Sequence, residues 1–258
     1  MDLQTSRITL LKVPIDIVPP ENLPEVIDGF LASMETPEGK TDEAYKHKNL
    51  VLLSVWDLLR ARRNKEYRNY ILNADLVIPI SMSLVSGAKF LTGIKPSRYM
   101  PFNFVISLLT LLEKREYPLY LLGSKRQVLK KAERNIHSTF PKIKIIGRCI
   151  GSIRKHEEPS IIAAIRKTSP SLLLAGEGIR GGELWIARND SQLNAGFRIW
   201  CSDLFDIFAE KKKRPSDAIF DRGLESIGFC FRNPLKFLRI FPFIRYKLLL
   251  LFYKLFVK

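Results

Sequence analysis

Two glycine-containing segments of this chain have residue types that suit the binding of an anion. The first, at 123–126 (GSKR), follows an apolar run and precedes a helical pattern, so its backbone amides and two cations could surround a phosphate group. The second contains Gly176, Glu177, Gly178 and Glu183, and its glycines permit close approach of the backbone to a ligand. Neither segment has the spacing of a Walker loop or a dinucleotide fingerprint, so a plain turn and a flexible surface loop remain as alternatives.

Two basic regions near the C-terminus favour contact with a diphosphate or an anionic membrane. Residues 211–215 have the sequence KKKRP, and this run includes Arg214. Residues 226–258 contain no Asp or Glu, but they contain seven cations and nine aromatic residues. Cations attract anionic lipids, and aromatic rings enter the interfacial zone of a bilayer. We therefore expect a tail that associates with an anionic membrane surface through these cations: Arg232, Lys236, Arg239, Arg245 and Lys247.

Three other interpretations of this tail compete with a membrane contact. Phe237, Phe241 and Ile244 recur at helical spacing and could belong to the core. Cations and rings also suit nucleic acid, but no nucleic-acid-binding motif accompanies them, so we expect no nucleic-acid partner. The purest apolar run, at 248–253, is far shorter than the ~20 residues of a transmembrane helix and ends at Lys254. The sequence favours a tail that lies on the membrane.

The composition indicates a folded, basic protein. A chain of 258 residues with 46% hydrophobic content can bury a full core. The net charge of +16 extends beyond the tail, and a basic body suggests an anionic ligand such as a nucleotide. The three cysteines are an odd number without close spacing, so they suggest neither a disulfide framework nor a zinc site, and we expect a reducing compartment. The N-terminus has no hydrophobic segment of the kind found in signal peptides, and His47, His137 and His156 are expected at the surface.

Apolar runs that alternate with helical patterns predict an α/β fold. The predicted strands lie at 7–17, 50–54, 75–80, 117–122, 143–147 and 171–175, and the predicted helices at 22–34, 55–72, 127–140 and 161–167. We expect a Rossmann-like, mostly parallel sheet flanked by helices, with a basic helical C-terminal appendage. The expected division is an α/β domain at 1–214 and an appendage at 215–258. Such sheets bind ligands at the carboxyl ends of their strands, which directs attention to the loops at 79–86, 123–126 and 176–182.

Several segments, in order along almost the whole chain, resemble the WecG/TagA/CpsF family of bacterial glycosyltransferases. The segments are ITLLKVPID (8–16), ARRNKEYR (61–68), NADLVIP (73–79), LLGS (121–124), ELWIARN (183–189), FD (205–206), KRP (213–215), GLE (223–225) and Pro234. No single segment is decisive, but their order and spacing make chance similarity an unsatisfactory explanation.

The resemblance implies a sugar transfer at the inner face of the bacterial cell membrane. The family transfers a sugar, often N-acetylmannosamine, from a UDP donor to an undecaprenyl-diphosphate-linked acceptor during the synthesis of surface polysaccharide or of teichoic-acid-type polymers. It implies no cofactor and no tightly bound metal. It also implies a cytoplasmic protein that is peripheral on the membrane, and it leaves a homo-oligomer open. In the family, the appendage carries arginines toward the active site and the membrane.

The family's catalytic residues are only partly matched. An Asp-Gly pair, whose carboxylate is the family's proposed general base, is replaced by Ile80 and Ser81, and isoleucine cannot accept a proton. A threonine of the family is absent near Leu52. We expect Glu177 as a substitute base. The substrate-binding residues that we expect are Arg98, Gly176, Gly178, Glu183 and Arg214, with the two arginines neutralising diphosphate charge.

Two hypotheses from different classes follow. The first is an active glycosyltransferase that uses a nucleotide sugar and a polyprenyl-diphosphate-linked acceptor. The second is a catalytically inactive homologue that retains nucleotide or lipid binding and acts as the partner of an active transferase. The second hypothesis is motivated by the combined loss of the family's Asp at Ile80, of its Thr near Leu52, and of the Gln in a Pro-x-Gln-Glu element that resembles 180–183 (RGGE) here.

Overall fold

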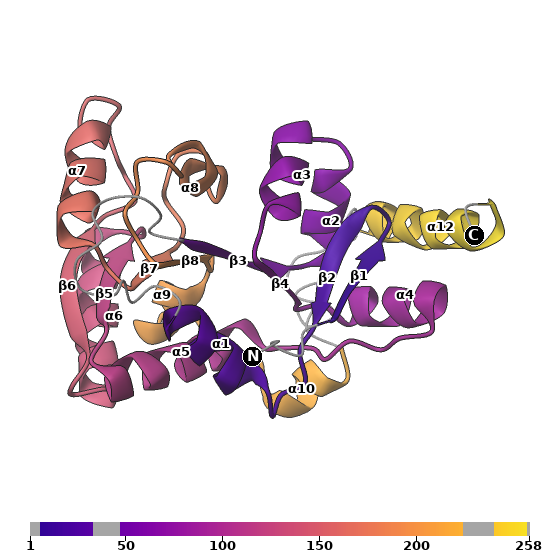
Figure 1. Ribbon diagram of the computed structural model, residues 1–258, viewed down its shortest axis with the longest axis horizontal. Coiled ribbons are helices and arrows are strands. Elements are labelled where there is room, and N and C mark those ends of the chain that lie inside the picture. Colours follow the sequence, from indigo (N-terminus) through magenta and orange to yellow (C-terminus); the bar gives the residue numbers. More distant parts are fainter. Residues whose placement is uncertain (1–5, 33–46, 224–239, 257–258) are drawn as a thin grey trace.

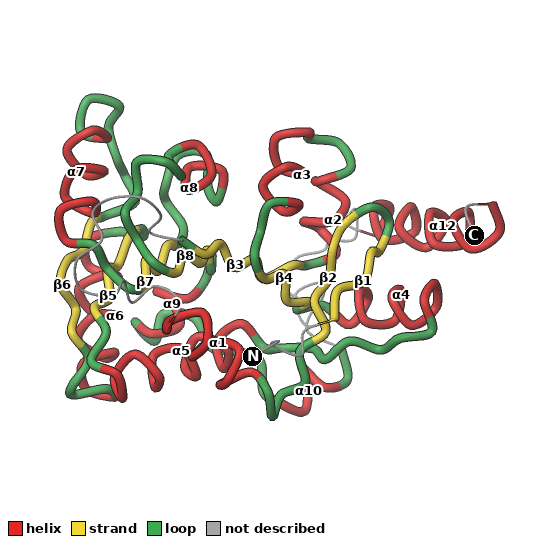
Figure 2. Tube along the Cα trace, viewed as in Figure 1, coloured by secondary structure: helices red, strands yellow, loops and turns green. Residues whose placement is uncertain are grey.

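A six-stranded parallel sheet forms the centre of the protein (Figures 1 and 2). The computed structural model describes residues 6–32, 47–223 and 240–256. The strand order is β4-β3-β8-β7-β5-β6, and each of the pairings in this order is parallel. The strands are β3 (Lys48–Leu53), β4 (Leu76–Pro79), β5 (Pro118–Leu122), β6 (Lys144–Cys149), β7 (Leu172–Ala175) and β8 (Phe197–Trp200). The predicted parallel α/β class is confirmed.

Helices cover both faces of this sheet (Figure 1). One face packs against α1 (Leu23–Ala32), α5 (Pro101–Arg115), α6 (Arg126–Thr139) and α9 (Leu204–Phe208). The other packs against α2 (Val55–Ala61), α3 (Lys65–Leu72), α7 (Glu158–Thr168) and α8 (Leu184–Arg188). Within β3, Leu50 and Leu52 enter the first core, whereas Val51 and Leu53 enter the second. This two-sided burial explains why the strands are continuous apolar runs.

A hairpin and three further helices complete the described chain. The two-stranded sheet pairs β1 (Ser6–Leu10) with β2 (Val13–Ile17) antiparallel. The helices α4 (Met82–Thr92), α10 (Asp217–Asp221) and α12 (Ile240–Phe256) follow later in the chain. In Figure 1, α4 and α12 lie side by side at the end of the molecule opposite α7, and contacts between them confirm this arrangement. The C-terminal helix that the sequence predicted is therefore present.

Two predicted elements are each divided into two. The single strand predicted at 7–17 is wrong, because Leu11 and Lys12 adopt φ values of 51° and 69° and form a two-residue hairpin turn. The single helix predicted at 55–72 is also wrong. Asn64 has an extended backbone, and its side-chain oxygen accepts a hydrogen bond from the amide of Tyr67 (3.0 Å). A new helix therefore begins at this N-cap.

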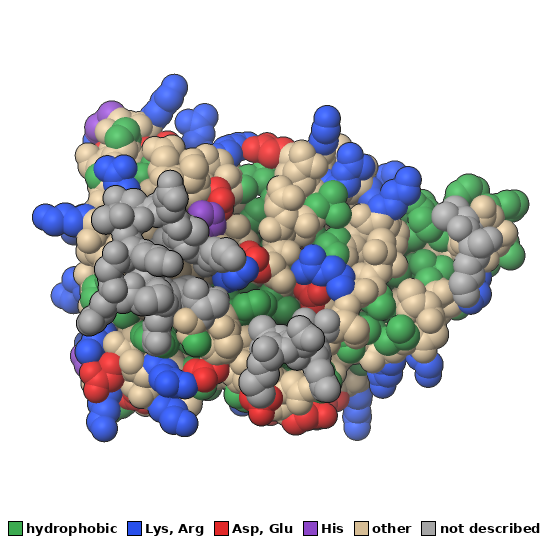
Figure 3. Space-filling view, viewed as in Figure 1, with side chains coloured by type: hydrophobic (Ala, Val, Ile, Leu, Met, Phe, Trp, Pro, Cys, Tyr) green, Lys and Arg blue, Asp and Glu red, His purple; other side chains and the backbone are tan. Residues whose placement is uncertain are grey.

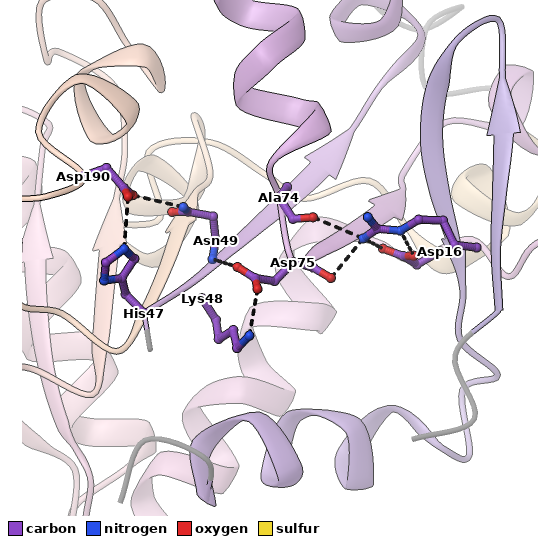
Figure 4. Close-up of polar contacts among 8 residues, drawn as sticks. Asp16, His47, Lys48, Asn49, Ala74, Asp75 and Asp190 are labelled. Atoms are coloured by element: carbon purple, nitrogen blue, oxygen red, sulfur yellow. Dashed lines mark hydrogen bonds and ion pairs between the residues drawn. The ribbon is translucent and has the colours of Figure 1, made fainter. Parts of the chain in front are cut away.

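An ion pair attaches the hairpin to the sheet (Figure 4). The guanidinium of Arg7 donates two hydrogen bonds to the buried carboxylate of Asp16, at 2.6 and 2.9 Å. It also donates to the carbonyl oxygens of Ala74 and Asp75. Asp16 additionally accepts a hydrogen bond from the amide of Val77 in β4 (2.6 Å). The pair thus satisfies backbone groups at the amino end of β4.

A second cluster of polar side chains lies at the amino ends of β3 and β8 (Figure 4). Asp190 contacts the ring of His47 at 3.0 Å and accepts a hydrogen bond from the side chain of Asn49 at 3.1 Å. The carboxylate of Asp190 also forms an ion pair, at 2.7 Å, with Arg198 on β8, whose side chain is fully buried. His47 therefore has a structural partner at the edge of the sheet that is opposite the carboxyl ends of the strands.

We predict that Asp16→Ala lowers the free energy of unfolding by about 2–3 kcal/mol, since charge-assisted hydrogen bonds from Arg7 and from the amide of Val77 would be lost. Urea denaturation followed by circular dichroism measures this change. Lys144→Ala, which removes an exposed ion pair with Glu116, is the control and should cost less than ~1 kcal/mol. Equal losses in the two variants would contradict the role assigned to Asp16.

Candidate active site

A cavity of about 510 Å³ opens at the carboxyl ends of β3, β4 and β8. Ser54 follows β3, Ile80 follows β4, and Ser202 and Asp203 follow β8, and all four residues line the cavity. Because the strands are parallel, their carboxyl ends meet at one edge of the sheet, which is the usual ligand-binding edge of such folds. The cavity lies where this architecture would place a substrate.

One wall of the cavity is a hydrogen-bonded group of acidic and phenolic side chains. Asp57 accepts hydrogen bonds from the amide and the hydroxyl of Ser54, at 2.9 and 2.5 Å, and from the hydroxyl of Tyr67 at 3.0 Å. Glu183 accepts a hydrogen bond from Arg60, whose guanidinium lies 4.0 Å from the centre of the Tyr67 ring. Burial and then the carboxylates of Asp57 and Glu183 raise the pKa of Tyr67, so this phenol remains a hydrogen-bond donor.

The opposite wall is more cationic. Lys212 and Lys213 line the cavity together with Asp203, and Lys212 forms an ion pair with Asp203. Behind Asp203 lies Glu177, which is exposed and whose backbone amide bonds to the carbonyl oxygen of Ser202 (3.4 Å). Partial burial, followed by the charges of Asp203 and Asp206, raises the pKa of Glu177. A carboxylate with a raised pKa is a stronger base than an ordinary one, so Glu177 is suited to accepting a proton.

Aromatic rings also border the cavity. Phe102, Trp200 and Phe220 are among its lining residues, together with apolar side chains such as Leu52 and Leu204. Aromatic faces suit the stacking of a nucleotide base or the apolar face of a sugar. The combination of rings with lysines on one wall suits a ligand that has both a ring and a phosphate group.

The two expected diphosphate-binding arginines contact residues that line the cavity. Arg98 donates to the carbonyl oxygens of Ile80 (3.0 Å) and Phe220 (2.5 Å), and its guanidinium lies 3.7 Å from the centre of the Phe220 ring. Burial lowers the pKa of Arg98 to about 10. Arg214 donates to the side chain of Asn103 at 2.7 Å and lies 5.9 Å from the ring centre of Phe102. Both arginines thus stand at the border of the cavity.

The glycines at the end of β7 serve the packing of loops. A side chain on Gly176 would place its Cβ 2.7 Å from the ring of Phe205, and Gly178 has a φ of +94° and lies against Gly151. The carbonyl oxygen of Glu177 accepts a hydrogen bond from the amide of Ser124 (2.5 Å), so the two glycine-containing segments are joined. Within the described residues, Gly176 and Gly178 do not line the cavity, whereas Glu183 from the same segment does.

Sequence reasoning missed Asp203, Asp57 and Tyr67. Asp203 follows β8, a four-residue strand that contains Arg198 and was therefore not recognised as a buried strand. Asp57 carried a detectable signal, because a serine three residues before an acidic residue is a capping box, and Ser54 and Asp57 form one here. Tyr67 carried no such signal, since its role depends on contacts with residues distant in the sequence.

The expected membrane residues are only partly within the described chain. Arg232, Lys236 and Arg239 lie outside it, whereas Arg245 and Lys247 are exposed on α12. Tyr246 and Leu250 on this helix are buried, and the Tyr246 hydroxyl donates to the carbonyl oxygen of Ser83 near the start of α4 (2.8 Å). No helix of the described residues has the length and apolar content to span a bilayer. The described residues also contain no group of three His, Cys, Asp or Glu side chains that could hold a metal ion.

One side of α12 exposes an apolar stripe (Figure 3). The hydrophobic side chains at the narrow end of the space-filling view lie over this helix. We use the name apolar stripe for seven residues, whose exposed fractions run from 47% at Ile244 to 72% at Phe256. They are Phe241, Ile244, Leu248, Leu251, Phe252, Leu255 and Phe256. A contiguous exposed apolar surface of this kind marks a site of interaction.

The fold and the cavity define a parallel α/β protein with a ligand site at the carboxyl edge of its sheet. The chain belongs to the glycosyl transferase WecG/TagA/CpsF family, whose model matches residues 8–258. It is also similar to a protein of Bacillus subtilis (strain 168) named N-acetylglucosaminyldiphosphoundecaprenol N-acetyl-beta-D-mannosaminyltransferase. The two are 22% identical over 191 residues, which cover 74% of each chain. The family resemblance noted from the sequence is therefore confirmed.

We predict from the raised pKa of Glu177 how the free energy of unfolding depends on pH. Because the folded-state pKa lies above the unfolded value, the proton on Glu177 stabilises the fold at low pH, and this contribution is lost as the pH rises through the folded-state pKa. Glu177→Gln cannot ionise, so it should gain stability relative to the unsubstituted protein between pH 3 and pH 7. Urea denaturation at both pH values measures the difference.

Glu116→Gln provides a control of opposite sign for this measurement. A hydrogen bond from Lys144 lowers the pKa of Glu116, so its ionised form stabilises the fold above the unfolded pKa and this contribution is lost as the pH falls. The Glu116 variant should therefore lose relative stability between pH 3 and pH 7. If Glu177→Gln changed in the same direction as Glu116→Gln, the environment assigned to Glu177 would be wrong.

Proposed function

We propose that this protein transfers a sugar from a nucleotide donor, of the UDP type, to a polyprenyl-diphosphate-linked acceptor in the synthesis of a bacterial surface polysaccharide or teichoic-acid-type polymer. The observation that supports this most is the cavity at the carboxyl ends of β3, β4 and β8, which combines flat rings with a lysine-rich wall. Family membership and the printed name of the Bacillus subtilis relative support the same reaction.

The proposed donor site is the cationic wall of the cavity. The leaving nucleoside diphosphate gains negative charge as the bond to the sugar breaks, and fixed cations stabilise that charge. Lys212 and Lys213 are proposed to contact the diphosphate, with Arg98 and Arg214 at the border of the cavity adding positive charge. Gly176 and Gly178 are proposed to act indirectly, because they set the position of the loop that carries Glu183.

The proposed general base is Asp203, with Glu177 as its partner. In the reaction, the acceptor hydroxyl loses its proton to the base, its oxygen forms the new glycosidic bond, and the nucleoside diphosphate leaves. Ile80 cannot accept this proton. Asp57 already accepts three hydrogen bonds within the protein, which favours a positioning role. Asp203 lines the cavity, and its neighbour Glu177 can take up the proton that Asp203 receives.

A membrane surface is the proposed partner of α12. The apolar stripe would enter the interfacial zone of the bilayer, and Arg245 and Lys247 would contact anionic headgroups. Tyr246 and Leu250 hold the helix against α4, so the bound membrane would lie at this end of the molecule. The proposed location is therefore the inner face of the cell membrane, with residues 1–214 as the α/β body and 215–258 as the appendage.

The second candidate function is a catalytically inactive homologue that binds nucleotide or lipid and partners an active transferase. Ile80 at the position of the family's Asp is the observation that favours it. Both candidates predict binding of substrates, and only the first predicts turnover.

We predict turnover when the purified protein is incubated with radiolabelled UDP-sugars and a short-chain polyprenyl-diphosphate-linked N-acetylglucosamine. Asp203→Asn should reduce kcat by about 10²–10⁴-fold, the usual contribution of a general base. Arg166→Gln, an exposed change on α7, is the control and should retain the activity of the unsubstituted protein. Absence of turnover with every donor would favour the inactive homologue, and full activity of Asp203→Asn would refute the assigned base.

We also predict that the double variant Arg245→Glu/Lys247→Glu loses affinity for vesicles that contain phosphatidylglycerol by roughly 30-fold or more, because each cation near such a surface contributes about 1 kcal/mol. Sedimentation with vesicles measures the bound fraction. Arg166→Glu/Lys167→Glu makes the same change of charge on α7, at the opposite end of the molecule, and should bind as before. Unchanged sedimentation of the α12 variant would exclude the proposed contact.

A further inference from the structure

A second, smaller pocket of about 280 Å³ lies between α2 and α12. Trp56, Leu59 and Pro242 supply its apolar surface. Three arginines also line it: Arg60 from α2, Arg63 from the turn after α2, and Arg245 from α12. The lining of the pocket is apolar, and three of the side chains that form it end in guanidinium groups. Such a pocket is complementary to a molecule that has an anionic group next to a hydrocarbon chain.

The charges of this pocket are available to a ligand. Among the residues that the structure describes, neither Arg63 nor Arg245 has an acidic side chain within ion-pair distance, and both are exposed. Arg60 does have an acidic partner, Glu183. The pocket therefore contains more positive charge than its own carboxylates neutralise, and guanidinium groups bind phosphate in a bidentate geometry.

Arg60 connects this pocket with the candidate active site. Its guanidinium binds Glu183 and lies over the ring of Tyr67, and both of these residues line the larger cavity. A ligand that contacts Arg60 in the small pocket thus lies next to the wall of the catalytic cavity. The proposed reaction does not require a membrane phospholipid to approach that cavity, whereas it does require the lipid that carries the reacting sugar to do so.

The other side of the small pocket adjoins the apolar stripe. Pro242 and Arg245 line the pocket, and Phe241 and Ile244, their neighbours on the same helix, belong to the stripe. A hydrocarbon chain that leaves the pocket along α12 would remain in contact with apolar side chains. The order of surfaces is then catalytic cavity, arginines, apolar pocket and apolar stripe, which matches the order of sugar, diphosphate and lipid chain in a polyprenyl-diphosphate-linked sugar.

We propose that the pocket between α2 and α12 binds the diphosphate and the first isoprene units of the lipid-linked acceptor, with Arg60, Arg63 and Arg245 on the diphosphate and Trp56 and Leu59 on the hydrocarbon. This inference rests on the proposed function, because it assigns a position to the acceptor of that reaction. It makes Arg63 a substrate-binding residue that lies in the turn between α2 and α3, outside the appendage.

Farnesyl diphosphate is the probe, because it combines a diphosphate with isoprene units and is soluble without detergent. Trp56 is partly exposed at the pocket, so its fluorescence reports binding there, whereas Trp200 lines the larger cavity and reports events in it. We expect a saturable change of emission that is absent in Trp56→Phe. Arg63→Glu should weaken binding by at least about tenfold, and inorganic diphosphate should bind more weakly than farnesyl diphosphate since it lacks the apolar contact.

Arg166→Glu is the matched control for the change of charge, and it should bind farnesyl diphosphate normally. Arg63→Gln is a milder variant that should show a smaller loss, and circular dichroism establishes that each variant is folded. The proposal is overturned if Arg63→Glu binds farnesyl diphosphate as the unsubstituted protein does, or if inorganic diphosphate binds equally well. It is also overturned if Arg63→Glu loses only its sedimentation with phosphatidylglycerol vesicles, because the pocket would then bind phospholipid headgroups.

The fluorescence measurement separates this proposal from the proposed function. Binding of farnesyl diphosphate that depends on Arg63, in a protein that transfers no sugar, would support the pocket and contradict the transferase. If the protein transfers sugar, Arg63→Glu should raise KM for the lipid acceptor at least about tenfold and leave KM for the nucleotide sugar unchanged. A transferase in which Arg63→Glu alters neither constant would support the function and overturn the pocket.

Discussion

The pairing of β3 with β8 is the interaction on which the candidate active site depends. These two strands join two parts of the sheet. One part consists of β4 and β3 and lies next to the hairpin, and the other consists of β8, β7, β5 and β6. Their register includes Lys48 with Phe197 and Leu50 with Ile199, and the cavity opens at the carboxyl ends of the same strands. Asp57 of the acidic wall follows β3, and Asp203 and Lys212 of the cationic wall follow β8. The pairing of β3 with β8 therefore helps to position Asp57 and Asp203 at the cavity.

A buried charge makes the register of this pair specific. Arg198 on β8 is 1% exposed, and burial lowers its pKa while the charge of Asp190 opposes that effect. Asp190 also holds Asn49, which is the register partner of Arg198 on β3. A slip of β8 by one residue would turn Arg198 to the opposite face, into the core that contains Leu50, and would leave a buried charge without a partner. The cost of that state favours the observed alignment, and with it the observed cavity.

The parallel sheet and most of its strands could be predicted from the sequence because buried parallel strands are continuous apolar runs. The exceptions have physical reasons. Phe197–Trp200 is short and contains a charged residue whose partner, Asp190, is recognisable only in three dimensions. Leu11 and Lys12 have positive φ angles that neither residue type favours, so the hairpin turn had no glycine or asparagine to signal it. The helix over 101–115 was not predicted either, although Pro101 at its first turn is a common helix-start residue.

The candidate site was less predictable than the fold, because glycine content identifies loops that pack closely without saying what they pack against. Gly176 and Gly178 lie against Phe205 and Gly151, whereas the cavity lies on the other side, toward β3. Arg98 and Arg214 were found through the family resemblance, and both contact residues that line the cavity. Neither glycine content nor the family resemblance identified Asp203, because it follows β8, the strand that was not predicted from the sequence.

An isoleucine at the end of β4 limits which wall of the cavity can perform acid–base chemistry. Ile80 lines the cavity, and its carbonyl oxygen accepts a hydrogen bond from Arg98, so the end of β4 has a fixed position but supplies no carboxylate. The acidic wall cannot easily replace that group, because Asp57 and Glu183 are engaged with Ser54, Tyr67 and Arg60. Among the described lining residues, the remaining carboxylate is Asp203, which is on the cationic wall with Lys212. If the proposed reaction takes place, proton acceptance and diphosphate binding therefore share one wall. Lys212 must then stabilise the leaving diphosphate and also release enough of its hold on Asp203 for that carboxylate to receive a proton. Entry of an anionic donor would favour this exchange, because the diphosphate competes with Asp203 for the same ammonium group.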